Sequence, residues 1–153
     1  MHHEPIVPPL ASRGRLAVTE AELREWGAHF GAAINPPLVV TVSGELGAGK
    51  TTLIQAICRG YGADEDVTSP TFALVHEYHA SRSRIYHLDL YRLKDETELT
   101  NIGWDEILVA EALILIEWPE RAGRRIPRDH VPISLQHLPD DANRRLLYAG
   151  GHV

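Results

Sequence analysis

The residues best suited to chemistry lie in the segment SGELGAGKTT, residues 43–52. Its Gly44, Gly49, Lys50 and Thr51 have the spacing G-x-x-x-x-G-K-[ST] of a phosphate-binding loop. Glycines let such a loop turn successive backbone N–H groups toward one concavity, and the lysine adds a point charge for the β- and γ-phosphates. The hydroxyl after the lysine is a ligand for magnesium. The segment therefore predicts a binding site for a nucleoside triphosphate.

Two acidic residues further along the chain are candidates for completing a magnesium site. Magnesium takes oxygen ligands in near-octahedral geometry, and an aspartate at the end of a nearby strand commonly contributes to its site. Asp89 lies in IYHLDLYR, where it shares a predicted strand face with His87 and Tyr91. Glu117 ends the apolar run ALILIE. Ligands bind at the ends of strands in α/β sheets, which favours a functional role for both carboxylates.

Each of these residues also has a plainer interpretation. Asp89 on its own fits a polar residue on a half-exposed strand, and Glu117 fits a helix-capping or salt-bridged carboxylate just past a strand. His87 either tunes the magnesium site or is a packed, hydrogen-bonded histidine. A buried carboxylate such as Glu117 is costly unless a cation or hydrogen-bond donor meets it, so its partner is the main question that the sequence raises.

A third segment gathers hydroxyl groups just before a predicted strand. In DVTSPTF, residues 66–72, Thr68, Ser69 and Thr71 surround Pro70. Such a loop can become ordered around a γ-phosphate and its metal and relax after hydrolysis, as switch segments do. An ordinary proline-containing turn is the alternative.

Periodicity predicts the helices that would position these residues. Thr19 and Glu22 have capping-box spacing, and an apolar stripe follows at helical spacing until the prolines at 36–37. A second helix is predicted over about residues 50–59, directly after the glycine-rich turn, and a short one over about residues 95–101.

The remaining apolar segments predict strands. Buried or alternating strands are predicted at LVVTVS, FALVHEYH, RIYHLDLY and ALILIE. VPISLQHL and NRRLLYAG predict an antiparallel C-terminal hairpin around residues 139–141. Helices alternating with buried strands predict an α/β fold like that of the P-loop NTPases, with a mainly parallel sheet flanked by helices.

Length and composition predict one domain. We expect a single domain over residues 16–153 behind a flexible arm at residues 1–15. The one cysteine, Cys58, excludes an internal disulfide framework and suits the cytoplasm. No apolar run approaches the roughly 20 residues of a membrane span, and no secretory signal region is evident. The net charge of −6 argues against a domain that binds nucleic acid without a partner.

Four segments together resemble the TsaE family, formerly called YjeE. GELGAGKTTL, VTSPTFALVHEY, IYHLDLYRL and LILIEWPER stand in the order and spacing of that family, and the resemblance covers about residues 19–150. The phosphate loop occurs in many families, whereas SPTF, H-x-D-L-Y-R and EWPE are much more specific. The family comprises small bacterial ATPases required for threonylcarbamoyl modification of the adenosine beside the tRNA anticodon.

The resemblance implies an ATP and magnesium site. The implied ATP-binding residues are Gly44, Glu45, Leu46, Gly47, Ala48, Gly49, Lys50, Thr51, Thr52, Thr71 and Trp118. Thr51, Asp89 and Glu117 are the implied metal residues, and Lys50 and Glu117 the implied catalytic residues. Thr71 would lie near the γ-phosphate and Trp118 beside the nucleotide. If Asp89 serves the magnesium, Glu117 is left to act on the attacking water.

The resemblance also implies partners. TsaE-like proteins associate with a TsaB–TsaD pair, in which TsaD transfers the threonylcarbamoyl group to tRNA. We therefore expect an ATPase that is weak alone, resets the assembly between turnovers and meets tRNA only indirectly, through the complex. No membrane partner is expected.

Two other classes of function remain open from the residues alone. A small-metabolite or nucleoside kinase also uses this loop, and ERAGRRIPR fits an arginine-bearing lid. A nucleotide-gated binding module would bind ATP and never turn it over. The cluster Arg121, Arg124, Arg125 and Arg128 either contacts RNA or an acidic partner, or is a solvated surface run.

Overall fold

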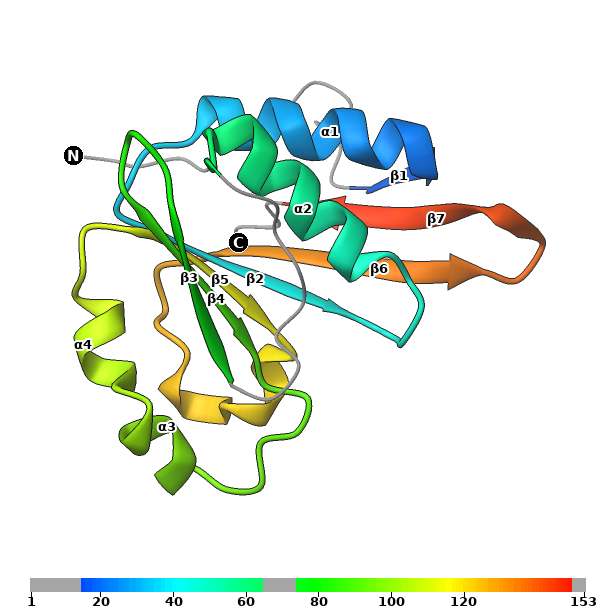
Figure 1. Ribbon diagram of the computed structural model, residues 1–153. Helices are drawn as coiled ribbons and strands as arrows, with labels where there is room; N and C mark the ends of the chain where they lie inside the picture. Colours follow the sequence, from blue (N-terminus) through cyan, green and yellow to red (C-terminus); the bar gives the residue numbers. More distant parts are fainter. Residues whose placement is uncertain (1–14, 65–73, 150–153) are drawn as a thin grey trace.

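The computed structural model describes residues 15–64 and 74–149. Seven strands form one sheet in the order β1-β7-β6-β2-β5-β4-β3 (Figure 1). β6, β2, β5 and β4 are parallel neighbours, whereas β1, β7 and β6 pair antiparallel, as do β4 and β3. The predicted α/β fold is confirmed, with a parallel core and an antiparallel C-terminal hairpin; the antiparallel edges make the sheet mixed.

The bounds of the elements follow the predicted segments closely. The strands are β1 Arg15–Thr19, β2 Leu38–Gly44, β3 Val75–His79, β4 Arg84–Asp89, β5 Leu113–Glu117, β6 Val131–Leu138 and β7 Asp141–Ala149. The α-helices are α1 Glu20–Ala33, α2 Lys50–Tyr61, α3 Thr97–Asn101 and α4 Trp104–Leu108, and two 3-10 turns span Pro119–Arg121 and Gly123–Arg125. The capping box at the start of α1 is present, with Thr19 and Glu22 each accepting from the other's backbone N–H.

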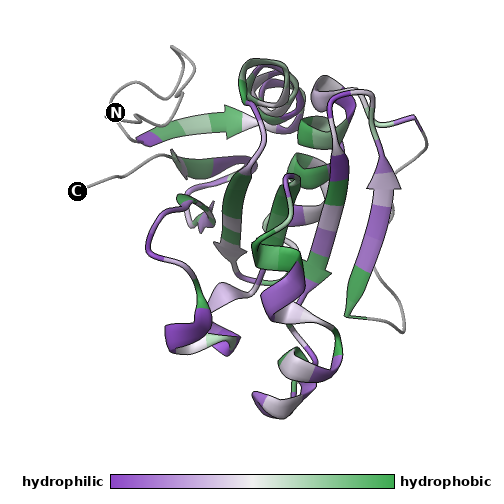
Figure 2. Ribbon diagram, turned by 90° about the vertical axis from the view of Figure 1, so that its left-hand side faces the viewer, coloured by the Kyte–Doolittle hydropathy of each residue, from purple (hydrophilic) through white to green (hydrophobic). Residues whose placement is uncertain are grey.

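The sheet is covered on both faces. α1 and α2 lie side by side on one face, while α3, α4 and the 3-10 turns cover the other (Figure 1). β5 shows why its sequence is almost continuously apolar: Leu113 and Leu115 face the α1–α2 side, and Ile114 and Ile116 face the other. Hydrophobic residues accordingly concentrate in the central strands, whereas the outer strand β3 is largely hydrophilic (Figure 2).

α1 and α2 pack closely because a glycine lies at their contact. A Cβ atom added to Gly31 would lie 2.1 Å from the backbone oxygen of Ile57 on α2. The backbones of α1 and α2 could not come this close if residue 31 carried a side chain. The close contact holds α2, and with it the phosphate loop at its N-terminus, against α1 and the sheet.

The structure differs from the sequence-based expectations in several places. β1 and α4 were not predicted, and α3 begins at Thr97, two residues later than predicted, with Glu96 at its N-cap position. The Thr97 N–H donates to the Asp95 carboxylate just before the helix. β4 ends at Asp89, so Tyr91 is not part of the strand: the Leu90 N–H donates to the Glu117 oxygen, and the Tyr91 N–H donates to Asp89 Oδ1.

Parts of two predicted segments lie outside the described residues. These are the predicted arm, apart from Arg15, and the hydroxyl-rich segment with Thr68, Ser69 and Thr71. Within the described part of the chain, none of the helices has the length and apolar character to cross a membrane.

Candidate nucleotide-binding site

The phosphate loop joins the end of β2 to the start of α2. Gly44, Gly47 and Gly49 all have positive φ (148°, 76° and 104°), a conformation that favours glycine. Gly44 is also confined by β6, because an added Cβ would lie 2.4 Å from the Leu135 oxygen. Since the Leu53 N–H makes the first bond of α2, to the Gly49 oxygen, the N–H groups of the first turn precede the helical ladder. Such a helix N-terminus favours a bound anion.

Lys50 is buried at the centre of the site. It is 6% exposed, and its Nζ donates to the backbone oxygens of Gly44 and Glu45, the latter at 2.8 Å. Nζ also lies 4.3 Å from the centre of the Trp118 ring, a cation–π distance. Burial lowers the pKa of Lys50, and the charges of Glu117 and Asp89 oppose that shift. The ammonium therefore rests on backbone oxygens and an aromatic face, where phosphate oxygens would be better partners.

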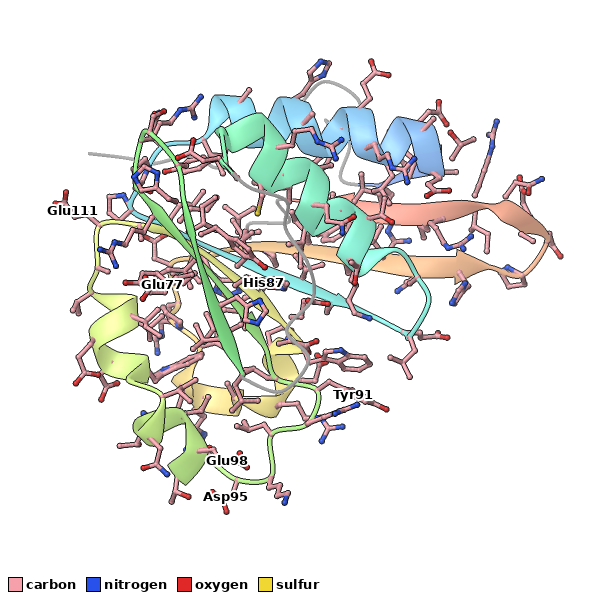
Figure 3. The ribbon with its side chains drawn as sticks, in the orientation of Figure 1. Glu77, His87, Tyr91, Asp95, Glu98 and Glu111 are labelled. Atoms are coloured by element: carbon pink, nitrogen blue, oxygen red, sulfur yellow. The ribbon has the colours of Figure 1, made fainter. Side chains whose placement is uncertain are left out.

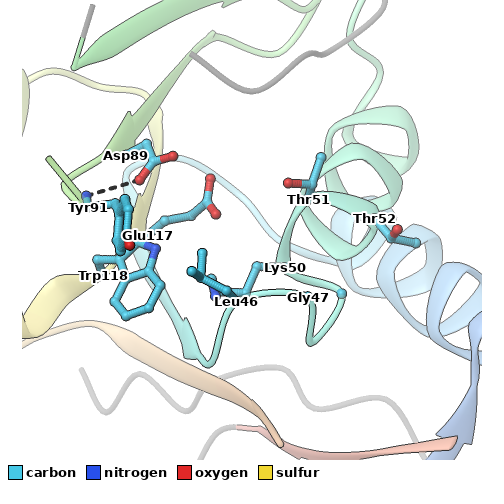
Figure 4. A pocket seen from close by; sticks show the side chains of 10 residues that line it. Leu46, Gly47, Lys50, Thr51, Thr52, Asp89, Tyr91, Glu117 and Trp118 are labelled. Carbon is cyan, nitrogen blue, oxygen red and sulfur yellow. Dashed lines mark hydrogen bonds between the residues drawn. The ribbon is translucent and has the colours of Figure 1, made fainter. Parts of the chain in front are cut away.

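Two carboxylates form the opposite wall. β4 and β5 run parallel with Asp89 in register with Glu117, so the two strand ends bring their acids together. Burial raises the pKa of Asp89; the Tyr91 N–H opposes the rise and the Glu117 charge adds to it. Figure 4 shows both carboxylates on one side of the pocket, with Thr51 facing them from α2. The predicted residues Thr51, Asp89 and Glu117 therefore do lie around one space.

Glu117 is almost fully buried, and its partner is a histidine. Its carboxylate is within 2.6 Å of His87 Nε2, while Glu117 is 3% exposed and His87 1% exposed. His87 is therefore a buried, hydrogen-bonded histidine, and its tuning of the magnesium site stays a prediction. The sequence places His87 on the same strand face as Asp89, but only the pairing of β4 with β5 reveals that it reaches Glu117.

Aromatic side chains form the rim of the site. Trp118 has a left-handed backbone (φ 57°, ψ 51°), anchored by its N–H donating to the Val42 oxygen on β2. Its ring lies 4.9 Å from that of Tyr91, centre to centre, and the Arg121 guanidinium lies 5.7 Å from the centre of the Tyr91 ring. Trp118 was predicted beside the nucleotide; the contributions of Tyr91 and Arg121 were not.

The arginine cluster divides into different environments. Arg125 donates to the Glu96 oxygen and the Thr100 hydroxyl and lies 3.6 Å from Asp105, so it ties the 3-10 turns to α3 and α4. Arg121, Arg124 and Arg128 are exposed, and the Arg121 guanidinium lies over the Tyr91 ring. Three of the four arginines are thus exposed, and the role of the cluster stays a prediction.

Three pockets border the phosphate loop, and two of them share part of its lining. The first, of about 360 Å³, is lined by Leu46, Gly47, Gly49, Lys50, Thr51, Thr52, Asp89, Tyr91, Glu117 and Trp118. The second, of about 480 Å³, is lined by Glu20, Leu23, Gly47, Ala48, Gly49, Thr52, Ala142, Asn143 and Arg145. They share Gly47, Gly49 and Thr52, so the loop is the wall between them. The third pocket, of about 840 Å³, includes Gly44 and Glu45 in its lining, and the backbone oxygens of these two residues hold Lys50. Of the predicted site residues, Thr71 lies outside the described residues.

The donors present suit magnesium bound together with phosphates. Among residues 15–64 and 74–149, no three His, Cys, Asp or Glu side chains gather to hold a metal ion. Magnesium is usually bound by one or two carboxylates, with phosphate oxygens and water completing its shell. The Thr51 hydroxyl with Asp89, and Glu117 beside it, fits that pattern.

The family model for "Threonylcarbamoyl adenosine biosynthesis protein TsaE" matches residues 17–146, which include the loop, both carboxylates and Trp118. The chain belongs to the TsaE family. A TsaE protein of Treponema pallidum is 38% identical over 124 residues, covering 81% of this chain and 90% of the relative. TsaE of Haemophilus influenzae is 37% identical over 110 residues, covering 72% and 70%, and that of Bacillus subtilis is 34% identical over 121 residues, covering 79% and 75%.

A solved structure agrees with the TsaE assignment. The crystal structure of Bacillus subtilis YdiB superposes with a TM-score of 0.70 at 26% sequence identity, covering 90% of this chain and 86% of that chain. The resemblance inferred from the four sequence segments is confirmed. The TsaE relatives are named for tRNA threonylcarbamoyladenosine biosynthesis.

Proposed function

We propose that the protein is a magnesium-dependent ATPase required for threonylcarbamoyl modification of the tRNA adenosine next to the anticodon. It acts on a TsaB–TsaD pair and does not transfer the group itself. The observation that carries the hydrolytic part is the arrangement of Lys50 at the loop, with Asp89 and the buried Glu117 on the opposite wall of one pocket. Membership of the TsaE family supports the tRNA part.

The two pockets suggest how ATP lies across the loop. The phosphates belong in the first pocket, where Lys50 and the N-terminus of α2 meet them. The γ-phosphate faces Asp89 and Glu117, so the nucleoside extends the other way, past Gly47 and Thr52, into the second pocket. Leu23 gives that pocket an apolar wall, and Asn143 and Arg145 give it polar groups.

Each side chain of the first pocket then has a role. Lys50 would exchange the oxygens of Gly44 and Glu45 for phosphate oxygens, and Thr51 and Asp89 would hold the magnesium. Magnesium would supply charge neutralisation for the phosphates. Glu117 orients the attacking water and accepts its proton.

The variant Glu117→Gln tests the hydrolytic role. Glutamine keeps the volume and an oxygen that can accept from His87, but it cannot take a proton from water. We expect ATP affinity within about threefold of the wild type and hydrolysis slower by about 100-fold or more, the usual contribution of a general base. Glu120→Gln, an exposed acid three residues away, is the matched control and should hydrolyse normally. If Glu117→Gln loses ATP binding instead, Glu117 is a metal or structural residue.

The kinase alternative has one observation in its favour, which is that Arg121 lies over Tyr91, a residue that lines the first pocket. Against a mobile lid, Arg125 in the same segment is tied to α3 and α4 by two hydrogen bonds and an ion pair. A kinase would also place the γ-phosphate on a small hydroxyl compound, whereas an ATPase releases it as inorganic phosphate.

A further inference from the structure

His87 is a buried, titratable side chain to which the proposed reaction assigns no role. In Figure 3 it lies within the body of the molecule, in contrast to Asp95, Glu98 and Glu111 at the outer rim. We propose that His87 is the positioning residue of the site: it holds the Glu117 carboxylate in place for the attacking water and keeps it apart from Lys50. This inference rests on the proposed ATPase function.

The contact follows from the pairing of two parallel strands. His87 on β4 is in register with Leu115 on β5, and Glu117 is the next residue of β5 on the same face. Glu117 is paired with Asp89 on β4, and His87 lies two residues before Asp89 on the same face. The Glu117 side chain can therefore contact His87. The 2.6 Å contact joins His87 Nε2 to Glu117 Oε2. In the ionised form that a general base requires, the Glu117 carboxylate only accepts, so the proposal has His87 Nε2–H as the donor.

The bond between His87 and Glu117 stabilises two buried polar side chains. Glu117 is 3% exposed, and a buried carboxylate without a donor is strongly disfavoured. On the histidine, Nδ1 has no hydrogen-bond partner among the described residues, so Glu117 is the polar contact that the described part of the chain offers to the imidazole. Only Oε2 is engaged by His87, which leaves Oε1 to face the pocket that Glu117 lines.

Lys50 is the competitor for Glu117. Among the carboxylates that oppose the effect of burial on the pKa of Lys50, Glu117 acts most strongly. A direct Lys50–Glu117 pair would occupy both the cation meant for phosphate and the base meant for water. In the structure Glu117 is bound by His87, while Lys50 Nζ donates to the Gly44 and Glu45 oxygens. His87 thus keeps the two groups available for ATP.

The chain offers a matched set of variants. His87→Leu removes the donor, and His87→Gln returns an N–H at similar reach. His87→Asn has an amide too short to reach Glu117. His76→Leu is the control: His76 lies directly opposite His87 on β3, but its Nδ1 contacts the Tyr78 hydroxyl at 3.1 Å. Circular dichroism checks the fold, and if His87→Leu does not fold, His87→Asn replaces it.

The experiment measures kcat for ATP hydrolysis and ATP affinity of the full chain with its TsaB–TsaD partners. We expect His87→Leu to lower kcat by about 10- to 100-fold, as loss of a supporting hydrogen bond does, with ATP affinity within about threefold. His87→Gln should recover most of the rate, and His76→Leu should match the wild type. Because His87 acts through Glu117, the double variant His87→Leu/Glu117→Gln should be no slower than Glu117→Gln alone.

Several results would overturn this role. These are a wild-type rate in a folded His87→Leu or His87→Asn variant, equal losses in His87→Gln and His87→Leu, or an undiminished effect of His87→Leu in the Glu117→Gln background. Each of these leaves the ATPase proposal standing, because the wild type still hydrolyses ATP. Absence of hydrolysis by the wild type with its partners would remove the ATPase proposal and, with it, the role of His87.

Discussion

Glu117 illustrates what a sequence can and cannot reveal about a single residue. Its position at the tip of the buried run ALILIE indicates that a cation or donor must meet it. The phosphate-loop lysine is a candidate visible in the motif. His87 cannot be identified as a partner in this way, because it reaches Glu117 only through the pairing of β4 with β5. The register between two strands far apart in the chain cannot be predicted from either segment alone.

The same limit applies to the rim of the pocket. Trp118 follows from the EWPE element, but Tyr91 was assigned to a strand that in fact ends at Asp89. Once the chain turns there, the Tyr91 ring can lie on Trp118 and beneath Arg121. The predicted roles of Lys50, Thr51, Asp89, Glu117 and Trp118 in binding and catalysis stay predictions, although the structure places all five around one pocket.

Lys50 offers a direct test at the residue scale. Lys50→Ala should abolish measurable ATP binding, because it removes the buried cation that faces the phosphates. Lys94→Ala is the matched control, since Lys94 is the other lysine of the chain and is exposed away from the pocket lining. Isothermal titration calorimetry with ATP and magnesium measures both variants. Unchanged affinity in Lys50→Ala would refute the phosphate-loop assignment.

At the scale of elements, most helices and strands were predictable from the sequence, but β1 and α4 were not. α1 shows its capping box and apolar stripe in the sequence, and β2 and β5 show continuous apolar runs. β1 and α4 are as short as β5, but neither contains the continuous apolar run that identifies β5. β1 exists because β7 pairs with it, from Arg15 opposite Tyr148 to Thr19 opposite Arg144.

The turn between β3 and β4 supports α1 in a way that periodicity cannot reveal. α1 has no basic residue in its last turn. Arg82 supplies one from the turn: its guanidinium donates to the backbone oxygens of Gly31, Ala32 and Ile34. The same group lies 5.1 Å from the centre of the Tyr61 ring at the end of α2, so one side chain joins both helices.

Arg82→Ala should therefore destabilise the fold. We expect the free energy of unfolding to fall by about 1–2 kcal/mol, from the loss of a cation at a helix C-terminus and of its hydrogen bonds. Arg84→Ala is the control, because Arg84 forms an exposed ion pair with Glu77 at 2.8 Å, and such pairs contribute about 0.2–1 kcal/mol. Urea denaturation measures both. Equal and small losses would mean that Arg82 does not hold the helices.

At the scale of the whole molecule, the parallel core of the sheet determines where the pocket lies. The net charge of the protein bears on whether it can bind tRNA without partners. The C-terminal ends of β2, β4 and β5 and the N-terminus of α2 meet at the same edge of the sheet, where the pocket lies (Figures 1 and 4). The net charge of −6 gives no overall attraction to a polyanion such as tRNA. Action through partners that hold the tRNA fits this charge.

The most direct test of the proposed function is the rate of inorganic phosphate release from ATP, measured with and without a TsaB–TsaD pair and tRNA. We expect slow release by the protein alone and clear stimulation by the complete set, because the proposed function requires the TsaB–TsaD partners. Glu117→Gln in the same assay controls for contaminating ATPases. Tight ATP binding without any release, or transfer of the phosphate to a small hydroxyl compound without stimulation, would contradict the ATPase role.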